Sequence, residues 1–253
     1  MNTILKCIAI VAVVALSTTM AFAEVPQAAP STSGMTVAEL EAKADALVKQ
    51  KQYLEATTYY KAAIAKDRKN AVLFNKRGIA NLQQADYRAA QSDFERAVKL
   101  RKNYPEALNN LGVVYYVRKD YGRAVRNYKK ALALNEGSAS FHSNLGTAWF
   151  AQKQLEKAIA EYTRAMELDP DVLMRSLQGG ITARVASPAD RALYNYIMAK
   201  MYAKRGDVDR AVLCLQKAKE EGYDKLDKIY VEDEFASVRG DQRVTQIVPP
   251  PVK

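Results

Sequence analysis

The strongest constraint on the fold is a pattern that recurs every 34 residues between positions 71 and 172. Gly78, Gly112 and Gly146 share one column of this pattern. Three further columns keep the same step, with the members Ala90, Ala124 and Ala158, then Phe94, Tyr128 and Tyr162, and finally Ala97, Ala131 and Ala165. Self-similarity at a period of about 20 to 50 residues is the signature of stacked structural units. The sequence therefore predicts a repeat protein rather than a chain with one central core.

Each unit predicts two short amphipathic helices. In residues 105–138, Leu108, Leu111 and Tyr115 recur at three- and four-residue steps, which is the spacing of one helical face. A polar stretch at 118–120 separates this helix from a second one. Glycine inside a helix costs about 1 kcal/mol relative to alanine, so a recurring glycine indicates that two helices approach closely there.

These residues resemble the tetratricopeptide repeat, whose signature is a large residue, Leu-Gly, an aromatic residue, and then spaced alanine, aromatic and alanine. The matching positions are Leu108, Leu111, Gly112, Tyr115, Ala124, Tyr128 and Ala131 in one unit, and Leu145, Gly146, Trp149, Ala158, Tyr162, Ala165 and Pro170 in the next. Arg77 departs from the family pattern, because leucine is usual at its position. The resemblance implies an all-α fold, a right-handed superhelical solenoid of about five helix pairs with a short insertion and a C-terminal helical cap.

The repeat register divides the chain into segments. Four tandem units are expected at 37–70, 71–104, 105–138 and 139–172, followed by an insertion at 173–191, a fifth unit at 192–225, and a cap and tail at 226–253. The fifth unit is interpreted as out of step, on the pattern Met198-Ala199, Tyr202, Ala211, Leu215 and Ala218. The insertion contains Gly179-Gly180 and is expected to be a hairpin or extended loop, while Ser187 and Pro188 predict the cap and first residue of the next helix. It could decorate the binding face or serve as a passive spacer.

The N-terminal residues predict export. Lys6, an apolar run at 8–16 and the small-residue motif ending at Ala23 have the form of a cleavable signal peptide covering residues 1–23. Residues 24–36, rich in Pro, Ala and Ser, are expected to be a flexible leader. We therefore expect a periplasmic or secreted protein. After cleavage Cys214 is the one cysteine left, which we expect to be buried and inert.

The sequence argues against catalysis. His142 is the one histidine in the chain, and together with Cys214 it is too little for a His/Cys metal cluster. No glycine-rich phosphate loop is present, because Gly179-Gly180 lacks the surrounding spacing and the lysine. We expect a non-catalytic protein without a metal or cofactor, in which His142 is a packing or groove residue.

A peptide-binding groove is the main functional hypothesis. When such helix pairs stack with a constant rotation, their first helices line the concave side of the superhelix. Asn110 and Asn144 also match a column where members of the resembled family use asparagine to hold a peptide backbone. The candidate groove residues are Asn75, Asn109, Asn110, Val113, Tyr116, Ser143, Asn144, Thr147 and Phe150. The alternative is that the asparagines contact solvent or stabilise the turn between helices.

The positive charge supports a second hypothesis. The chain has a formal net charge of +10, and one face of the second helix in residues 105–138 is strongly basic. Its members are Arg123, Arg126, Lys129 and Lys130. This face could bind an anionic component of the cell envelope or another polyanion, although lysines on such a face often only contact water. We expect no nucleic-acid partner for an exported protein, and the sequence indicates neither the partner's identity nor the oligomeric state.

Overall fold

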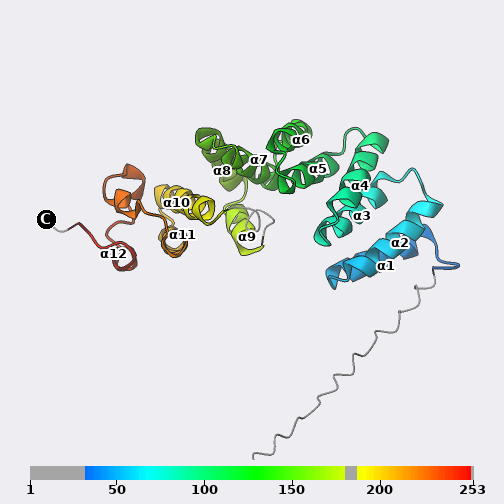
Figure 1. The fold of residues 1–253 in the computed structure, drawn as a ribbon, viewed down its shortest axis with the longest axis horizontal. Helices are drawn as coiled ribbons and strands as arrows, with labels where there is room; N and C mark the ends of the chain where they lie inside the picture. The colour runs from blue at the N-terminus through cyan, green and yellow to red at the C-terminus, as the bar shows by residue number, and fades with distance from the viewer. Residues whose placement is uncertain (1–31, 180–186, 252–253) are drawn as a thin grey trace, which may run out of the picture.

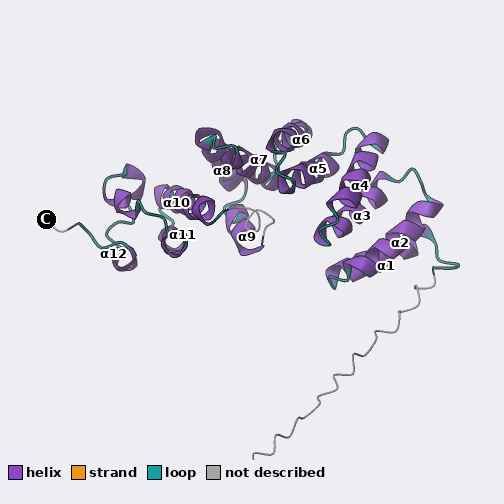
Figure 2. Ribbon diagram, viewed as in Figure 1, coloured by secondary structure: helices purple, strands orange, loops and turns teal. Residues whose placement is uncertain are grey.

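The computed structural model of the chain describes residues 32–179 and 187–251, which form twelve α-helices and two short 3-10 helices, without a strand. Figure 2 shows this all-helical composition. The predicted signal peptide, residues 1–23, lies outside the described residues, as do 24–31 of the leader.

The first eight helices form four consecutive pairs with the same dimensions. In each pair the first helix has 13 residues and the second has 14. The pairs are α1 (Val37–Lys49) with α2 (Tyr53–Lys66), α3 (Ala71–Gln83) with α4 (Tyr87–Leu100), α5 (Pro105–Val117) with α6 (Tyr121–Leu134), and α7 (Ala139–Ala151) with α8 (Leu155–Leu168). Each second helix packs on the next first helix, α2 on α3, α4 on α5 and α6 on α7. In Figure 1 the pairs follow one another along an arc, which confirms the predicted helical solenoid.

The glycine column has a direct steric cause. A methyl group on Gly112 would lie 2.6 Å from Cε1 of Tyr128, and one on Gly78 would lie 2.6 Å from Cε1 of Phe94. Both rings are almost fully buried. The aromatic side chain of the second helix therefore lies directly on the backbone of the first, and a glycine is needed at the contact.

The turn within each pair has a recurrent left-handed residue. Lys51, Ala85, Lys119 and Lys153 have φ angles of 62°, 60°, 62° and 61°. They too are spaced by 34 residues. A left-handed conformation costs an L-residue about 1–2 kcal/mol, and glycine avoids that cost. The three lysines are therefore conformationally strained at positions where glycine would not be.

Residues 173–179 and 188–191 are helical, which differs from the hairpin or extended loop expected for this segment. Val172–Gly179 form a helix, α9, which packs against α7 and α8. Residues 180–186 lie outside the described residues. Helix α10 (Pro188–Lys204) begins before position 192, and the Ser187 side chain accepts a hydrogen bond from the Asp190 backbone N–H. The predicted helix start at Ser187 and Pro188 is thus confirmed.

The repeat register beyond residue 172 carries a signal that the sequence interpretation missed. Gly180, Ala192, Tyr196 and Ala199 continue the four columns at the same 34-residue step. In the structure, however, α10 packs closely with α11 (Val208–Glu220), as the out-of-step pattern predicts. Helix α10 therefore carries two overlapping patterns. One is the out-of-step pattern that pairs it with α11, and the other is the continued 34-residue register.

Short helices close the C-terminal end. They are η2 (Leu226–Tyr230), η3 (Asp233–Phe235) and α12 (Gln242–Ile247). Ile229, Phe235, Val238 and Val244 are fully buried and belong to the same apolar cluster as α10 and α11. These elements cover the last helix pair, as a repeat array requires at its end. No helix in the described part of the chain combines the length and hydrophobicity needed to cross a membrane.

Candidate binding surfaces

The four predicted groove asparagines form one hydrogen-bonded row across three repeats. Asn144 Nδ2 on α7 donates to Asn109 Oδ1 on α5 at 2.9 Å, and Asn110 Nδ2 on α5 donates to Asn75 Oδ1 on α3 at 3.0 Å. A longer contact of 3.5 Å runs from Asn109 Nδ2 to Asn110 Oδ1. We call Asn75, Asn109, Asn110 and Asn144 the asparagine row. Its amides pair with one another between repeats, a role that neither sequence hypothesis included.

The same inter-repeat contact occurs one unit earlier with charged groups. Lys76 stands 34 residues before Asn110, and its Nζ donates to Glu41 Oε1 at 2.7 Å and to Asp45 Oδ2 at 2.6 Å. Although partial burial opposes it, hydrogen bonds from the lysine to the two carboxylates leave the pKa of Lys76 above its ordinary value. The residue at this register position therefore reaches back to the preceding first helix at three successive junctions.

Most of the predicted groove residues are more enclosed than an open groove would leave them. Six of the nine are between 4% and 8% exposed, namely Asn75, Asn109, Tyr116, Ser143, Thr147 and Phe150. Asn110, Val113 and Asn144 are half-buried. A ligand on the concave side would therefore meet chiefly these three side chains, and the aromatic contacts expected from Tyr116 and Phe150 are largely used within the protein.

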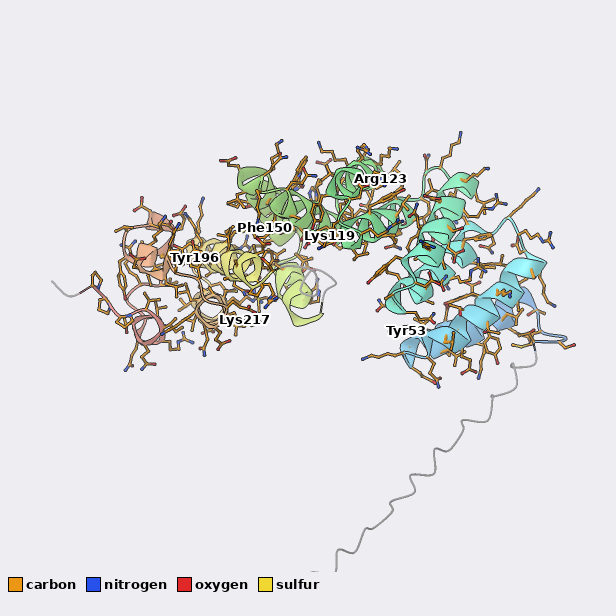
Figure 3. The ribbon with its side chains drawn as sticks, in the orientation of Figure 1. Tyr53, Lys119, Arg123, Phe150, Tyr196 and Lys217 are labelled. Atoms are coloured by element: carbon orange, nitrogen blue, oxygen red, sulfur yellow. The ribbon has the colours of Figure 1, made fainter. Side chains whose placement is uncertain are left out.

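Helix α10 accounts for the burial around α7. The Phe150 and Tyr194 rings meet edge to face with centroids 5.7 Å apart, and Tyr194 lies at the same distance from Tyr162. Tyr162 in turn donates its hydroxyl to Thr147 Oγ1 at 3.2 Å. Figure 3 shows Phe150 where α7 approaches the yellow helix α10. Helix α9 also packs on α7, so both α9 and α10 contact the fourth repeat.

His142 links α7 to α8 and to the turn before α7. Its Nδ1 lies 2.7 Å from Glu161 Oε2 on α8, and its Nε2 lies 3.0 Å from the Glu136 carbonyl oxygen in the turn before α7. Both ring nitrogens thus lie beside hydrogen-bond acceptors, one a carboxylate oxygen and the other a carbonyl oxygen. The side chain is buried. This placement agrees with the packing role expected from the sequence.

The basic face on α6 is partly engaged within the protein. Arg123 Nε donates to Asp120 Oδ2 at 2.5 Å, and the Arg123 guanidinium lies 4.6 Å from the Tyr115 ring centroid. Lys129 Nζ lies 5.3 Å from the Trp149 ring. Arg126 and Lys130 are exposed and form no ion pair with the residues that the structure describes. In Figure 3 Arg123 projects from the outer side of the arc.

The residues that could bind a metal or react as a thiol are the metal-ligand types and the one cysteine of the described chain, Cys214. These residues contain no group of three or more His, Cys, Asp or Glu side chains able to hold a metal ion. Cys214 is free and fully buried, which confirms the predicted burial, and this burial raises the pKa of its thiol to about 12. A thiol with so high a pKa is a poor nucleophile, because the thiolate is the reactive form.

Comparison with known families identifies part of the array. Residues 105–138 and residues 139–172 each match a family model described as tetratricopeptide repeat. These two repeats make up less than half of the chain. No curated protein matches the sequence.

Solved structures of MamA proteins share the fold. MamA from residue 41 to its end, from Desulfovibrio magneticus RS-1, is 21% identical with a TM-score of 0.52, and the match covers 75% of this chain and 96% of that one. A MamA RS-1 ArsTM double mutant is 20% identical with a TM-score of 0.52, covering 73% and 93%. A further crystal structure of MamA is 20% identical with a TM-score of 0.50, covering 70% and 93%. The chain thus contains two tetratricopeptide repeats, at residues 105–172, within an all-helical solenoid that resembles MamA.

Proposed function

We propose that the protein is an exported, non-catalytic scaffold that binds an extended segment of a protein partner along the concave side of its first helices. The observation that carries the proposal is the asparagine row. Tetratricopeptide folds generally serve as interaction scaffolds. The row adds side chains whose chemistry suits a peptide backbone.

The row holds two amides in place and leaves hydrogen-bonding groups for a ligand. An asparagine side chain offers two N–H donors and an oxygen with two lone pairs. Asn144 uses one donor in the row, and Asn110 uses one donor and accepts the longer contact from Asn109. Within the described residues no other hydrogen bond involves these two amides, and both are half-buried. They can therefore pair with a peptide group whatever its side chain.

The accessible side chains direct the ligand to the first helices of the second and third repeats and to Asn144 on α7. Thr147 and Phe150 on α7 are buried, whereas Ile79, Leu82 and Val113 on α3 and α5 remain half-buried. Each amide–peptide hydrogen bond contributes about 1 kcal/mol net. Two or three such bonds with modest apolar contact support weak binding that tolerates many sequences.

The test is affinity capture from the exporting cell, followed by measurement of Kd for the captured partner. The Asn110→Ala/Asn144→Ala variant is expected to lose most of the proteins that the wild type captures. The Kd of the wild type for its partner is expected to change little with salt concentration. Asn103→Ala/Asn127→Ala, which alters two asparagines outside the row, is the matched control and should capture the wild-type set. Circular dichroism verifies that each variant folds.

Two results would overturn the proposal. One is an unchanged captured set with the Asn110→Ala/Asn144→Ala variant. The other is binding that weakens steeply with salt and is lost on Arg126→Glu/Lys130→Glu, because electrostatic binding is screened by salt. That outcome would assign the function to the basic face on α6 and an anionic envelope component.

Export rests on the sequence of residues 1–23 and needs its own test. Cleavage after Ala23 would leave Glu24 as the first residue of the mature protein. N-terminal sequencing of the protein recovered from the periplasmic or secreted fraction should find Glu24. A protein that retains Met1 and stays with the cytoplasmic fraction would contradict this part of the proposal.

A further inference from the structure

A cavity of about 370 Å³ lies between α8, α10 and η3, away from the asparagine row. Ile159 and Met166 line it from α8, and Ile197 and Met201 line it from α10. These four side chains make an apolar floor. Ile159 is 37% exposed, so its side chain can be reached from solvent.

The cavity lies where the arrangement of the helix pairs changes, after the fourth repeat. In the earlier repeats each second helix packs on the first helix that follows, as α6 packs on α7. At this junction α8 is followed by α9, while α10 packs closely with α11 and with η3. Apolar residues of α8 and α10 belong to one buried cluster, and the cavity lies at the edge of this cluster, where Ile159 remains partly exposed.

The rim of the cavity carries a net positive charge. Lys200, Lys204 and Arg205 line it together with one carboxylate, that of Glu234. Glu234 is already paired, because Lys200 Nζ lies 3.3 Å from Glu234 Oε1 and 3.2 Å from Glu232 Oε2. Lys204 and Arg205 are exposed and take part in no ion pair with the described residues. Both charges are therefore exposed at the rim, where an anion from outside can reach them.

We propose that this cavity binds one large apolar side chain of a protein partner, next to an acidic residue that pairs with Lys204 and Arg205. The volume lies at the lower end of the range for ligand pockets, roughly 300–1,000 Å³, which suits a single leucine or aromatic side chain. Met166 and Met201 can repack around different apolar groups, because methionine is unbranched and flexible. The inference rests on the proposed function only in that the ligand belongs to a protein partner.

Methyl NMR of the full mature chain tests this site directly. With ¹³C-labelled methionine and isoleucine methyls, the probe N-acetyl-Phe-Glu-amide is expected to shift the signals of Met166, Met201 and Ile159 in the low-millimolar range. The oppositely charged N-acetyl-Phe-Lys-amide should bind measurably more weakly, by up to about fivefold, as expected for loss of an exposed ion pair. N-acetyl-Ser-Glu-amide, which lacks the apolar group, should not shift these methyls.

Charge reversal supplies the matched comparison. Lys204→Glu/Arg205→Glu should reverse the preference between the two phenylalanine dipeptides, whereas Lys66→Glu/Arg68→Glu, an equal change of charge in the first repeat, should leave it unchanged. Equal shifts with the acidic and basic dipeptides, or none at the cavity methyls, would overturn the proposal. The Asn110→Ala/Asn144→Ala variant should still bind the acidic dipeptide, so failure at the cavity and failure at the asparagine row are distinguishable.

Discussion

Replacing Gly112 by alanine is expected to destabilise the protein even though alanine is the better helix former. In a helix interior the substitution alone would contribute about 1 kcal/mol of stability. Here the new methyl group would lie 2.6 Å from Cε1 and 2.7 Å from Cδ1 of Tyr128. The Tyr128 ring is only 2% exposed and has little room to move. Overpacking of a core costs about 1–3 kcal/mol, so we expect a net loss of about 1 kcal/mol.

Urea denaturation followed by circular dichroism measures the change, and amide hydrogen exchange in α5 and α6 locates it. Gly122→Ala is the matched control, because Gly122 is in α6 and the nearest atom to its added methyl group is Arg126 Nη1 at 3.9 Å. That variant should be as stable as the wild type or slightly more stable. The contrast between the two alanines isolates the steric contact from helix propensity.

A double-mutant cycle with Tyr128→Leu gives the decisive comparison. Removing the ring is destabilising in itself, but it should make a subsequent Gly112→Ala change neutral or stabilising. The coupling between the two substitutions should then be about 1 kcal/mol or more. The reasoning is refuted if Gly112→Ala does not destabilise the wild type, or if it costs as much without the Tyr128 ring as with it.

Three further predictions concern stability and reactivity. Lys119→Gly should raise the free energy of unfolding by about 1 kcal/mol in urea denaturation, because φ is 62° at this residue; an unchanged or lower stability would contradict the strain argument. Arg77→Leu should destabilise the protein by about 3–5 kcal/mol, although leucine is the residue usual at this position in the resembled family. The substitution leaves the buried Asp93 without the two hydrogen bonds, of 2.9 and 2.6 Å, that the guanidinium donates. The Arg77→Leu/Asp93→Leu double variant should recover most of the loss. Burial raises the pKa of the Cys214 thiol to about 12, so Cys214 should resist iodoacetamide at pH 8 until the protein is denatured. Its contribution to the free energy of unfolding should be complete below its ordinary pKa of 9.0 and fall as the pH rises toward 12. Rapid labelling of the native protein would contradict this reasoning.

Local structure in the repeats was predictable from the sequence because its causes lie close together in the chain. The contact between Gly112 and Tyr128 joins residues 16 positions apart in one unit, and the same pair recurs in two other units. The helix start at Ser187 is likewise set by residues that are neighbours in sequence. Contacts between residues so close in the chain can be predicted without knowing how distant segments pack together.

The end of the array depended on tertiary packing. Helix α10 carries both the continued columns at Ala192 and Tyr196 and an out-of-step pattern that pairs it with α11. In the structure the Tyr196 ring stacks on Tyr223 at 4.4 Å and lies 5.5 Å from Phe235, so the cap occupies that side of the helix. The sequence of α10 alone fits both the regular register and pairing with α11. Which packing forms depends on the tertiary contacts that α11 and the cap make with α10.

The proposed binding surface was likewise determined partly by the sequence and partly by the tertiary packing. The sequence by itself determined that Asn110 and Asn144 share a register position on successive first helices, because a period of 34 residues places them there. Only the tertiary structure decided that these amides donate to Asn75 and Asn109 of the preceding repeat, and that α10 covers Phe150. The physical reason is that hydrogen-bond partners and burial depend on how closely neighbouring units approach, and that distance results from the packing of all the units together.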